Sequence, residues 1–202
     1  MSAELDRFGR VKQQVTYLRV ATAGLLLAAV VGWSDLLLLV MGHVVPGWTV
    51  SAGLFFVSLV LMGVHAARRL SADDRTLSGR ALPRVALGLL AATAGLGCAA
   101  GAFSDFMGSA EYRVLEPAGP DGCVAVVRET SFLKISDGEV YAMGSSGVAW
   151  RESGSWMADD MHRPVAEGTY ELDWNRSGGT FRVGGTATDP IVSADLNPLD
   201  CG

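Results

Sequence analysis

The sequence predicts a membrane α-helical region followed by an all-β domain, built as a small antiparallel β-sandwich or partly closed barrel. Three apolar stretches fill the first half of the 202-residue chain, at residues 20–45, 50–67 and 85–103. Residues 104–202 hold most of the acidic side chains and have the composition of a soluble domain. Because these two parts use the whole length, we expect one membrane unit and one outer domain.

The third stretch, residues 85–103, gives the strongest prediction of a membrane span. It holds 19 residues without a charge, and a helix needs about 20 apolar residues to cross a hydrocarbon layer of about 30 Å. The first stretch, residues 20–45, is longer than the apolar core of about 7 to 15 residues in a cleaved signal peptide. We therefore expect a retained first span that also directs insertion, and three transmembrane helices in all.

The distribution of charge predicts the orientation of these spans. Residues 1–19 carry a net charge of +2 and the connection 68–84 carries +3. Residues 104–202 have seven basic and sixteen acidic residues, a net charge of −9. Short cytoplasmic segments retain Lys and Arg, so the N-terminus and the connection 68–84 are predicted to be cytoplasmic. The C-terminal domain is then extracytoplasmic, in agreement with an odd number of spans.

Two polar residues of the first stretch, Asp35 and His43, are candidates for an intramembrane function. A carboxylate at membrane depth is costly and usually has a partner, and His43 lies eight residues further along a similar helical face. The alternatives are a protonated carboxyl group, a contact with a neighbouring helix, or a span that ends at Trp33. In that last case residues 37–45 would lie along the membrane surface.

Turn-forming and small residues predict how the helices pack. Pro46, Gly47 and Trp48 suit a tight outer turn, so the first two spans are predicted to form a helical hairpin. Gly97 and Gly101 form a small-xxx-small pair, which lets helix backbones approach closely. We expect this pair to pack within the chain. The alternative is a helix that is simply rich in alanine.

Runs of β-forming residues alternate with turn signals about every ten residues from Glu111 onward, which is typical of antiparallel sheets. The clearest pair is 169–174 and 180–183, where apolar and polar side chains alternate on either side of a turn. The Asp137-Gly138 dipeptide is predicted to be another turn. The remaining predicted strands are 111–116, 123–129, 131–136, 139–143 and 148–152.

Cys123 and Cys201 are the only cysteines of the outer domain. The space outside a cell membrane permits disulfides, so we expect these two residues to pair. A bond that closes a loop of nearly eighty residues would stabilise the folded state by about 4 kcal/mol on the chain-entropy model. The alternative is a pair of free thiols.

The densest polar cluster of the outer domain is Asp159, Asp160, His162 and Arg163. It lacks the ligand spacing of a zinc site or a calcium loop, so a solvated loop is expected. The serines of the Gly144 to Gly147 run do not match a nucleophile elbow. We therefore assign no catalytic residue, metal or cofactor, and the negative charge of the domain argues against a nucleic-acid partner.

Trp150, Trp156 and Met157 are the candidate contacts with a partner, because aromatic residues and methionine are enriched at interface centres. The alternative is that they fill the core of the domain.

The run Glu111 to Pro117, continued by Gly122 and Cys123, and the run Gly168 to Leu172 stand in a chain rich in Ala, Gly, Arg and Asp. In these features the outer domain resembles uncharacterised small membrane proteins of high-GC Gram-positive bacteria with a C-terminal extracytoplasmic β-domain. The resemblance implies a cell-envelope location and carries over no activity and no catalytic residue.

The leading hypothesis is a non-enzymatic integral membrane protein whose outer β-domain binds a protein partner or a cell-envelope component. A second hypothesis is an accessory subunit of a transporter or channel in which Asp35 and His43 line a polar route. A third is an enzyme that uses Asp159, Asp160 and His162, which would require these side chains to converge in a pocket.

Overall fold

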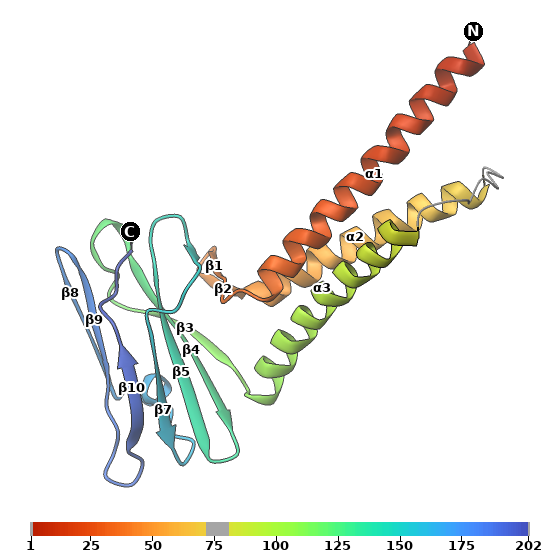
Figure 1. Cartoon of the computed structure of the whole chain (residues 1–202). Helices are drawn as coiled ribbons and strands as arrows, with labels where there is room; N and C mark the ends of the chain where they lie inside the picture. Colours follow the sequence, from red (N-terminus) through yellow and green to blue (C-terminus); the bar gives the residue numbers. More distant parts are fainter. Residues whose placement is uncertain (1, 72–80, 202) are drawn as a thin grey trace. The chain divides into compact units, whose positions relative to one another are not determined.

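The computed structural model describes residues 2–71 and 81–201 and contains long helices followed by antiparallel sheets (Figure 1). The helices are α1 (Ser2–Gly32), α2 (Gly47–Ser71) and α3 (Ala81–Met107). Within these described residues, two segments are long and apolar enough to cross a membrane, Gly47–Arg68 and Val85–Met107. The apolar part of α1, Thr16–Gly32, is shorter. The predicted basic connection 68–84 falls largely on residues outside the described ranges.

The chain divides into two compact units. The helical unit comprises residues 1–33 and 48–100, and the β unit comprises residues 34–47 and 101–202. The prediction of a helical region followed by a β domain is therefore right in outline. One piece of the β unit, residues 34–47, lies between two helices in the sequence. Most of it, residues 34–45, falls within the predicted first span.

The prediction of a helix over residues 20–45 is wrong after Gly32. Strands β1 (Leu37–Val40) and β2 (His43–Pro46) form a hairpin instead. Its two-residue loop is Met41-Gly42, and both residues have positive φ, at 51° and 79°. Positive φ at both positions is the geometry of a tight hairpin turn. The chain therefore reverses at Gly42 and not at the predicted turn, where Gly47 already begins α2.

Small side chains allow the helices to approach closely within the helical unit. A Cβ atom at Gly24 would overlap the Ser58 hydroxyl, and one at Gly32 would lie 2.8 Å from the Ser51 hydroxyl. The buried Ser51 donates a hydrogen bond to the Ala28 carbonyl at 2.6 Å. These contacts pair α1 with α2.

The third helix meets the same region of α1. A Cβ atom at Gly97 would lie 3.1 Å from the carbonyl carbon of Gly32 and 2.9 Å from the Trp33 indole nitrogen. Cys98, the next residue, shares a 3.0 Å hydrogen bond with Ser51. Gly97 therefore lies at a close approach of α3 to the end of α1. Gly101 is half-buried and belongs to the β unit.

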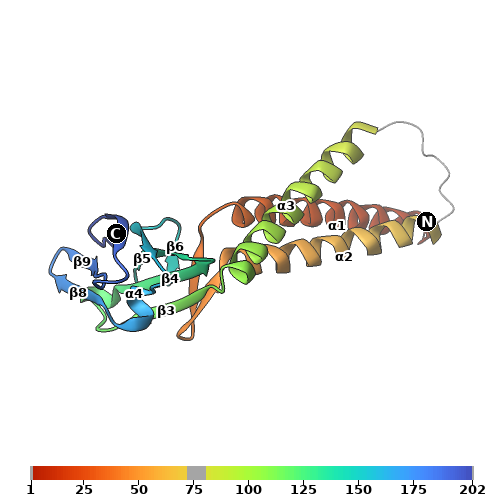
Figure 2. The same ribbon diagram turned by 90° about the horizontal axis from the view of Figure 1, so that it is seen from below.

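The β unit is organised around a five-stranded antiparallel sheet, seen from two sides in Figures 1 and 2. Its strand order is β10-β7-β5-β4-β3. The strands are β3 (Glu111–Leu115), β4 (Val124–Phe132), β5 (Ile135–Met143), β7 (Gly154–Asp159) and β10 (Ile191–Leu196). The β1–β2 hairpin adds β6 (Val148–Ala149) to make a separate three-stranded sheet, and β8 (Tyr170–Asn175) pairs with β9 (Gly178–Val183).

Each face of the large sheet carries an apolar cluster, because side chains alternate along every strand. On one face, Trp156 and Tyr170 pack against Phe181 of β9, with ring centroids 5.5 and 5.9 Å apart. On the other face, Leu37 of β1 packs in a cluster whose other buried members are Val126, Tyr141, Met143 and Ala149. The β1–β2 hairpin thus covers part of the second face, and the rest of that face stays open.

Two local predictions within the large sheet are wrong. Residues 131–136 are the tip of the β4–β5 hairpin and not a separate strand, and Gly138 lies inside β5 and not in a turn. Gly138 is needed there because a Cβ atom would overlap the Trp156 indole, which lies over it from β7. Gly138 is therefore explained by the close approach of the Trp156 ring and not by a reversal of the chain.

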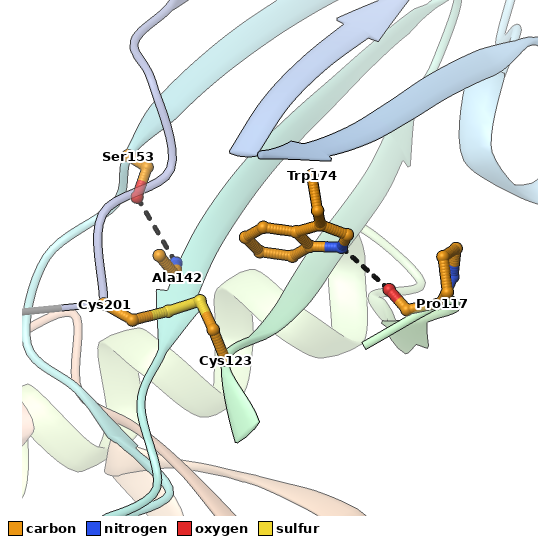
Figure 3. Close-up of a disulfide and its surroundings, with 6 residues drawn as sticks. All are labelled: Pro117, Cys123, Ala142, Ser153, Trp174 and Cys201. Atoms are coloured by element: carbon orange, nitrogen blue, oxygen red, sulfur yellow. Dashed lines mark hydrogen bonds between the residues drawn. A yellow bond between two sulfur atoms is a disulfide. The ribbon is translucent and has the colours of Figure 1, made fainter. Parts of the chain in front are cut away.

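A disulfide joins Cys123 to Cys201, as the sequence predicts (Figure 3). The Cα atoms are 5.9 Å apart and 78 residues apart in the sequence. Nearby, the Trp174 indole donates a hydrogen bond to the Pro117 carbonyl at 2.8 Å. The last residues are also held by backbone hydrogen bonds between Gly179 and the buried Leu199.

Candidate functional site: the groove on the open sheet face

One row of polar side chains crosses the open face of the five-stranded sheet. Strand pairing places Tyr112, Arg128, Glu139, Ser155 and Asp195 opposite one another, each on a different strand. Because directly paired residues project to the same face, these five side chains stand side by side. Four members of the row, all except Tyr112, line a groove with a volume of about 550 Å³.

A second row and one loop complete the groove. Thr130, Asp137, Met157 and Ser193 lie opposite one another on the neighbouring rung of the sheet. Glu152, from the segment before β7, adds a carboxylate to the lining. The groove therefore contains four carboxylates, at Asp137, Glu139, Glu152 and Asp195.

The single arginine of the groove, Arg128, is already engaged by two carboxylates. Its Nη2 and Nε donate hydrogen bonds to Asp105 at 2.8 and 3.1 Å, and its Nη1 donates to Glu139 at 3.3 Å. Burial lowers the pKa of Arg128, because it disfavours the guanidinium charge. The negative charges of Glu139 and Asp105 have a larger effect in the opposite direction, so the pKa lies above its usual range. The side chain is therefore permanently charged and fixed in position.

Two tyrosines complete this hydrogen-bond network. The Tyr112 hydroxyl donates to Asp105 at 2.8 Å, and the Tyr141 hydroxyl donates to Glu139 at 2.9 Å. Burial, together with these carboxylates, raises the pKa of both phenols. Both tyrosines therefore remain protonated at neutral pH and act as hydrogen-bond donors that orient the carboxylates.

The Glu152 carboxyl group is surrounded by an excess of negative charge. Its pKa is raised by burial and then by the negative charges of Glu139, Asp35 and Asp195. Arg128 cannot cancel this potential, because its charge is already matched by Asp105 and Glu139. The groove thus presents a net negative surface in which the Glu139 carboxylate is held by Arg128 and Tyr141, and such a surface suits a cationic group.

Asp35 and His43 do not lie in a membrane helix. Both residues lie after the end of α1, in the β unit, and both are exposed. The prediction of an intramembrane pair is wrong because the helix stops at Gly32, as the alternative of a span ending near Trp33 allowed. Asp35 instead contributes negative charge that acts on Glu152.

The polar cluster of Asp159, Asp160 and His162 does not converge on a pocket. Both aspartates are exposed, whereas His162 is buried. Its Nδ1 lies 3.0 Å from Glu167, and its Nε2 lies 3.2 Å from both the Gly184 carbonyl and the Thr169 hydroxyl. These contacts hold the loop before β8. Within residues 2–71 and 81–201, no group of three or more His, Cys, Asp or Glu side chains is arranged to hold a metal ion.

The three residues predicted as partner contacts have different environments. Trp150 is exposed, next to β6. Met157 is half-buried and lines the groove. Trp156 is buried, and its ring contacts Phe181. The tryptophan of β7 is therefore a core residue, which is the alternative that the sequence left open.

Three residues that define the groove were not predicted from the sequence: Arg128, Glu139 and Asp195. For Arg128 and Glu139 the sequence does hold a signal, which is the alternation of side chains along each strand. One face is shared by Val126 and Arg128 of β4 and by Glu139 and Tyr141 of β5. Nothing in the sequence shows that these strands pair in this register. Comparisons of the chain with protein-family models, with curated proteins and with solved structures find no match.

Proposed function

We propose that the chain is a non-enzymatic membrane protein whose β unit lies outside the cytoplasm and binds a cationic group of a protein partner or cell-envelope component in the groove. The observation that carries the proposal is the excess of negative charge in the groove of about 550 Å³, where the pKa of Glu152 is raised by burial and by its acidic neighbours.

The membrane part of the proposal is supported by the exposure of the apolar helices. Only 11% of the most apolar stretch of Gly47–Arg68 and 17% of that of Val85–Met107 are buried. A core helix of a soluble protein would hide this surface, whereas lipid covers it at no cost. The 17-residue stretch Thr16–Gly32 of α1 is at the lower limit, about 17 residues, of what crosses a bilayer. We propose that Thr16–Gly32 also crosses the membrane, which gives three spans in all.

The orientation follows from charge. Three spans place the N-terminus and the β unit on opposite sides, and the basic residues of the N-terminal segment and of the connection 68–84 favour the cytoplasm. A disulfide between Cys123 and Cys201 fits an oxidising compartment. Labelling of Ser177→Cys, on the exposed β8–β9 turn, by an impermeant maleimide in intact cells tests this orientation. Labelling only after the cells are opened would contradict it.

Binding in the groove is tested by photo-crosslinking in cells. A photoreactive amino acid at Ser193, an exposed residue of the groove lining, is expected to give a crosslinked product. The double variant Glu152→Gln with Asp195→Asn should reduce the yield of that product several-fold, because it removes two negative charges from the lining.

The matched control is Glu171→Gln with Asp173→Asn. It removes the same charge from exposed positions on β8, outside the groove lining, and should leave the yield unchanged. Equal loss of product in both double variants would show that the net charge of the domain matters and that the groove does not. Equal yield in the unaltered protein and the groove variant would refute the proposal directly.

A further inference from the structure

The tip of the β4–β5 hairpin displays apolar side chains where a soluble domain would place polar ones. Phe132, Leu133 and Ile135 are 52%, 76% and 46% exposed. Phe132 pairs with Ile135, so the loop between the strands is Leu133-Lys134. Met161, 55% exposed, donates its backbone N–H to the Lys134 carbonyl at 3.2 Å and lies next to the loop. We call Phe132, Leu133, Ile135 and Met161 the apolar tip.

The backbone makes leucine an unusual choice at this loop. Leu133 has a φ of +57°, in the left-handed region that hairpin loops normally fill with Gly, Asn or Asp. A bulky residue in this conformation is strained, and burial within the domain does not compensate Leu133, since most of its surface is exposed. Strained residues of this kind cluster at functional positions.

Hydrogen bonds tie the apolar tip to the end of α3. Ser131, next to Phe132, donates its N–H to the Gly108 carbonyl at 2.7 Å, and Arg163 donates to the Ser109 carbonyl at 2.9 Å and to the Ser131 hydroxyl at 2.8 Å. Gly108 follows directly after Met107, the last residue of the apolar segment Val85–Met107. Asp105 accepts hydrogen bonds from Arg128 of the sheet, so a membrane-spanning α3 leaves the hydrocarbon before Asp105, and the tip is held beside the outer end of this helix.

From this proximity we propose that the apolar tip inserts into the boundary between lipid headgroups and acyl chains and gives the β unit a second anchor. This inference rests on the proposed membrane location. Lys134, the only lysine of residues 104–202, can keep its amine among the headgroups while its stem lies along the apolar layer. Asp159 and Asp160 directly precede Met161, so insertion depends on apolar area and zwitterionic lipid is sufficient.

The test uses the full chain, with Cys98 replaced by Ala, in phosphatidylcholine vesicles that contain lipids brominated on the acyl chain. Single cysteines carry an environment-sensitive fluorophore. Leu133→Cys reports on the apolar tip, Ser177→Cys on the exposed β8–β9 turn, and Leu96→Cys on an exposed position of α3. A non-reducing gel confirms that the Cys123–Cys201 disulfide has formed in each variant.

The expected result is strong quenching by brominated lipid at positions 96 and 133 and at least several-fold weaker quenching at 177. Quenching at 96 with none at 133 would overturn this inference and leave the membrane location intact. Absence of quenching at 96 would overturn both.

A second variant separates insertion from accidental proximity. A label at Met161→Cys is read in a chain carrying Phe132→Ser and Leu133→Asn, because asparagine accepts the positive φ of the loop and the turn is retained. Quenching at 161 should fall several-fold relative to the chain with the native Phe132 and Leu133. Unchanged quenching would show that the apolar side chains do not hold the hairpin in the lipid, which would also overturn the inference.

Discussion

Removal of the Cys123–Cys201 disulfide is expected to destabilise the β unit strongly. The bond closes a loop of 78 residues, and the chain-entropy relation gives a stabilisation of about 4.5 kcal/mol at 25 °C for a loop of that length. A domain typically has about 5–15 kcal/mol of stability in total. The double variant Cys123→Ser with Cys201→Ser should therefore lose about 30% or more of it.

Hydrogen exchange of the backbone amides of β4 and β5, measured by mass spectrometry on the full chain in detergent micelles, reports the free energy of opening of the β unit. Chemical reduction of the unaltered protein should give the same loss as the double variant. Cys98→Ser is the matched control, because Cys98 is the free cysteine of the helical unit. A loss of opening free energy below about 1 kcal/mol would refute the reasoning, since it would mean that removal of the disulfide gives the unfolded chain little additional conformational freedom.

Four further changes have defined outcomes. Gly138→Ala should lower the free energy of unfolding by about 1–3 kcal/mol, because the new methyl group overlaps a tryptophan ring; urea unfolding measures it. Gly24→Leu should lower the thermal stability of the helical unit, whereas Gly53→Leu, at a position with no neighbour within 4 Å, should not. Burial raises the pKa of Glu129 above 4.5, so its contribution to stability is present below pH 4.5 and is lost as the pH rises through the raised pKa. Glu129→Gln should abolish that part of the pH profile of urea unfolding. The pKa of Glu152 is raised in the same direction, so crosslinking from the groove should weaken on acidification before an ordinary carboxylate would be protonated, and Glu152→Gln should reduce this dependence.

The sequence predicted the strands whose two faces differ. Residues 169–174 and 180–183 alternate between apolar and polar side chains, and the structure has β8 and β9 there. The strand β10 (Ile191–Leu196) was not predicted, because four of its six residues are exposed and it lacks an alternating pattern. The prediction of a helix over residues 37–45 was wrong because it depended on apolar content alone. A continuous apolar run fits a helix and a buried strand equally well.

The groove could not be predicted from the sequence, because it depends on strand register. Glu139 and Asp195 are far apart in the sequence and reach the same row only because each pairs with Ser155. A shift of one residue in either pairing would turn one of them to the opposite face. The disulfide was predictable, since only two cysteines follow α3 and composition alone restricted the choice.

The placement of the β1–β2 hairpin between two helices has a consequence for recombinant work. The β unit is assembled from residues 34–47 and 101–202, so a fragment that begins after α3 lacks the strand to which β6 pairs. Such a fragment would expose Tyr141 and Met143 to water and should aggregate. A soluble version for crystallisation or binding assays would need residues 34–47 grafted back through a linker, in effect a permuted chain without the helices.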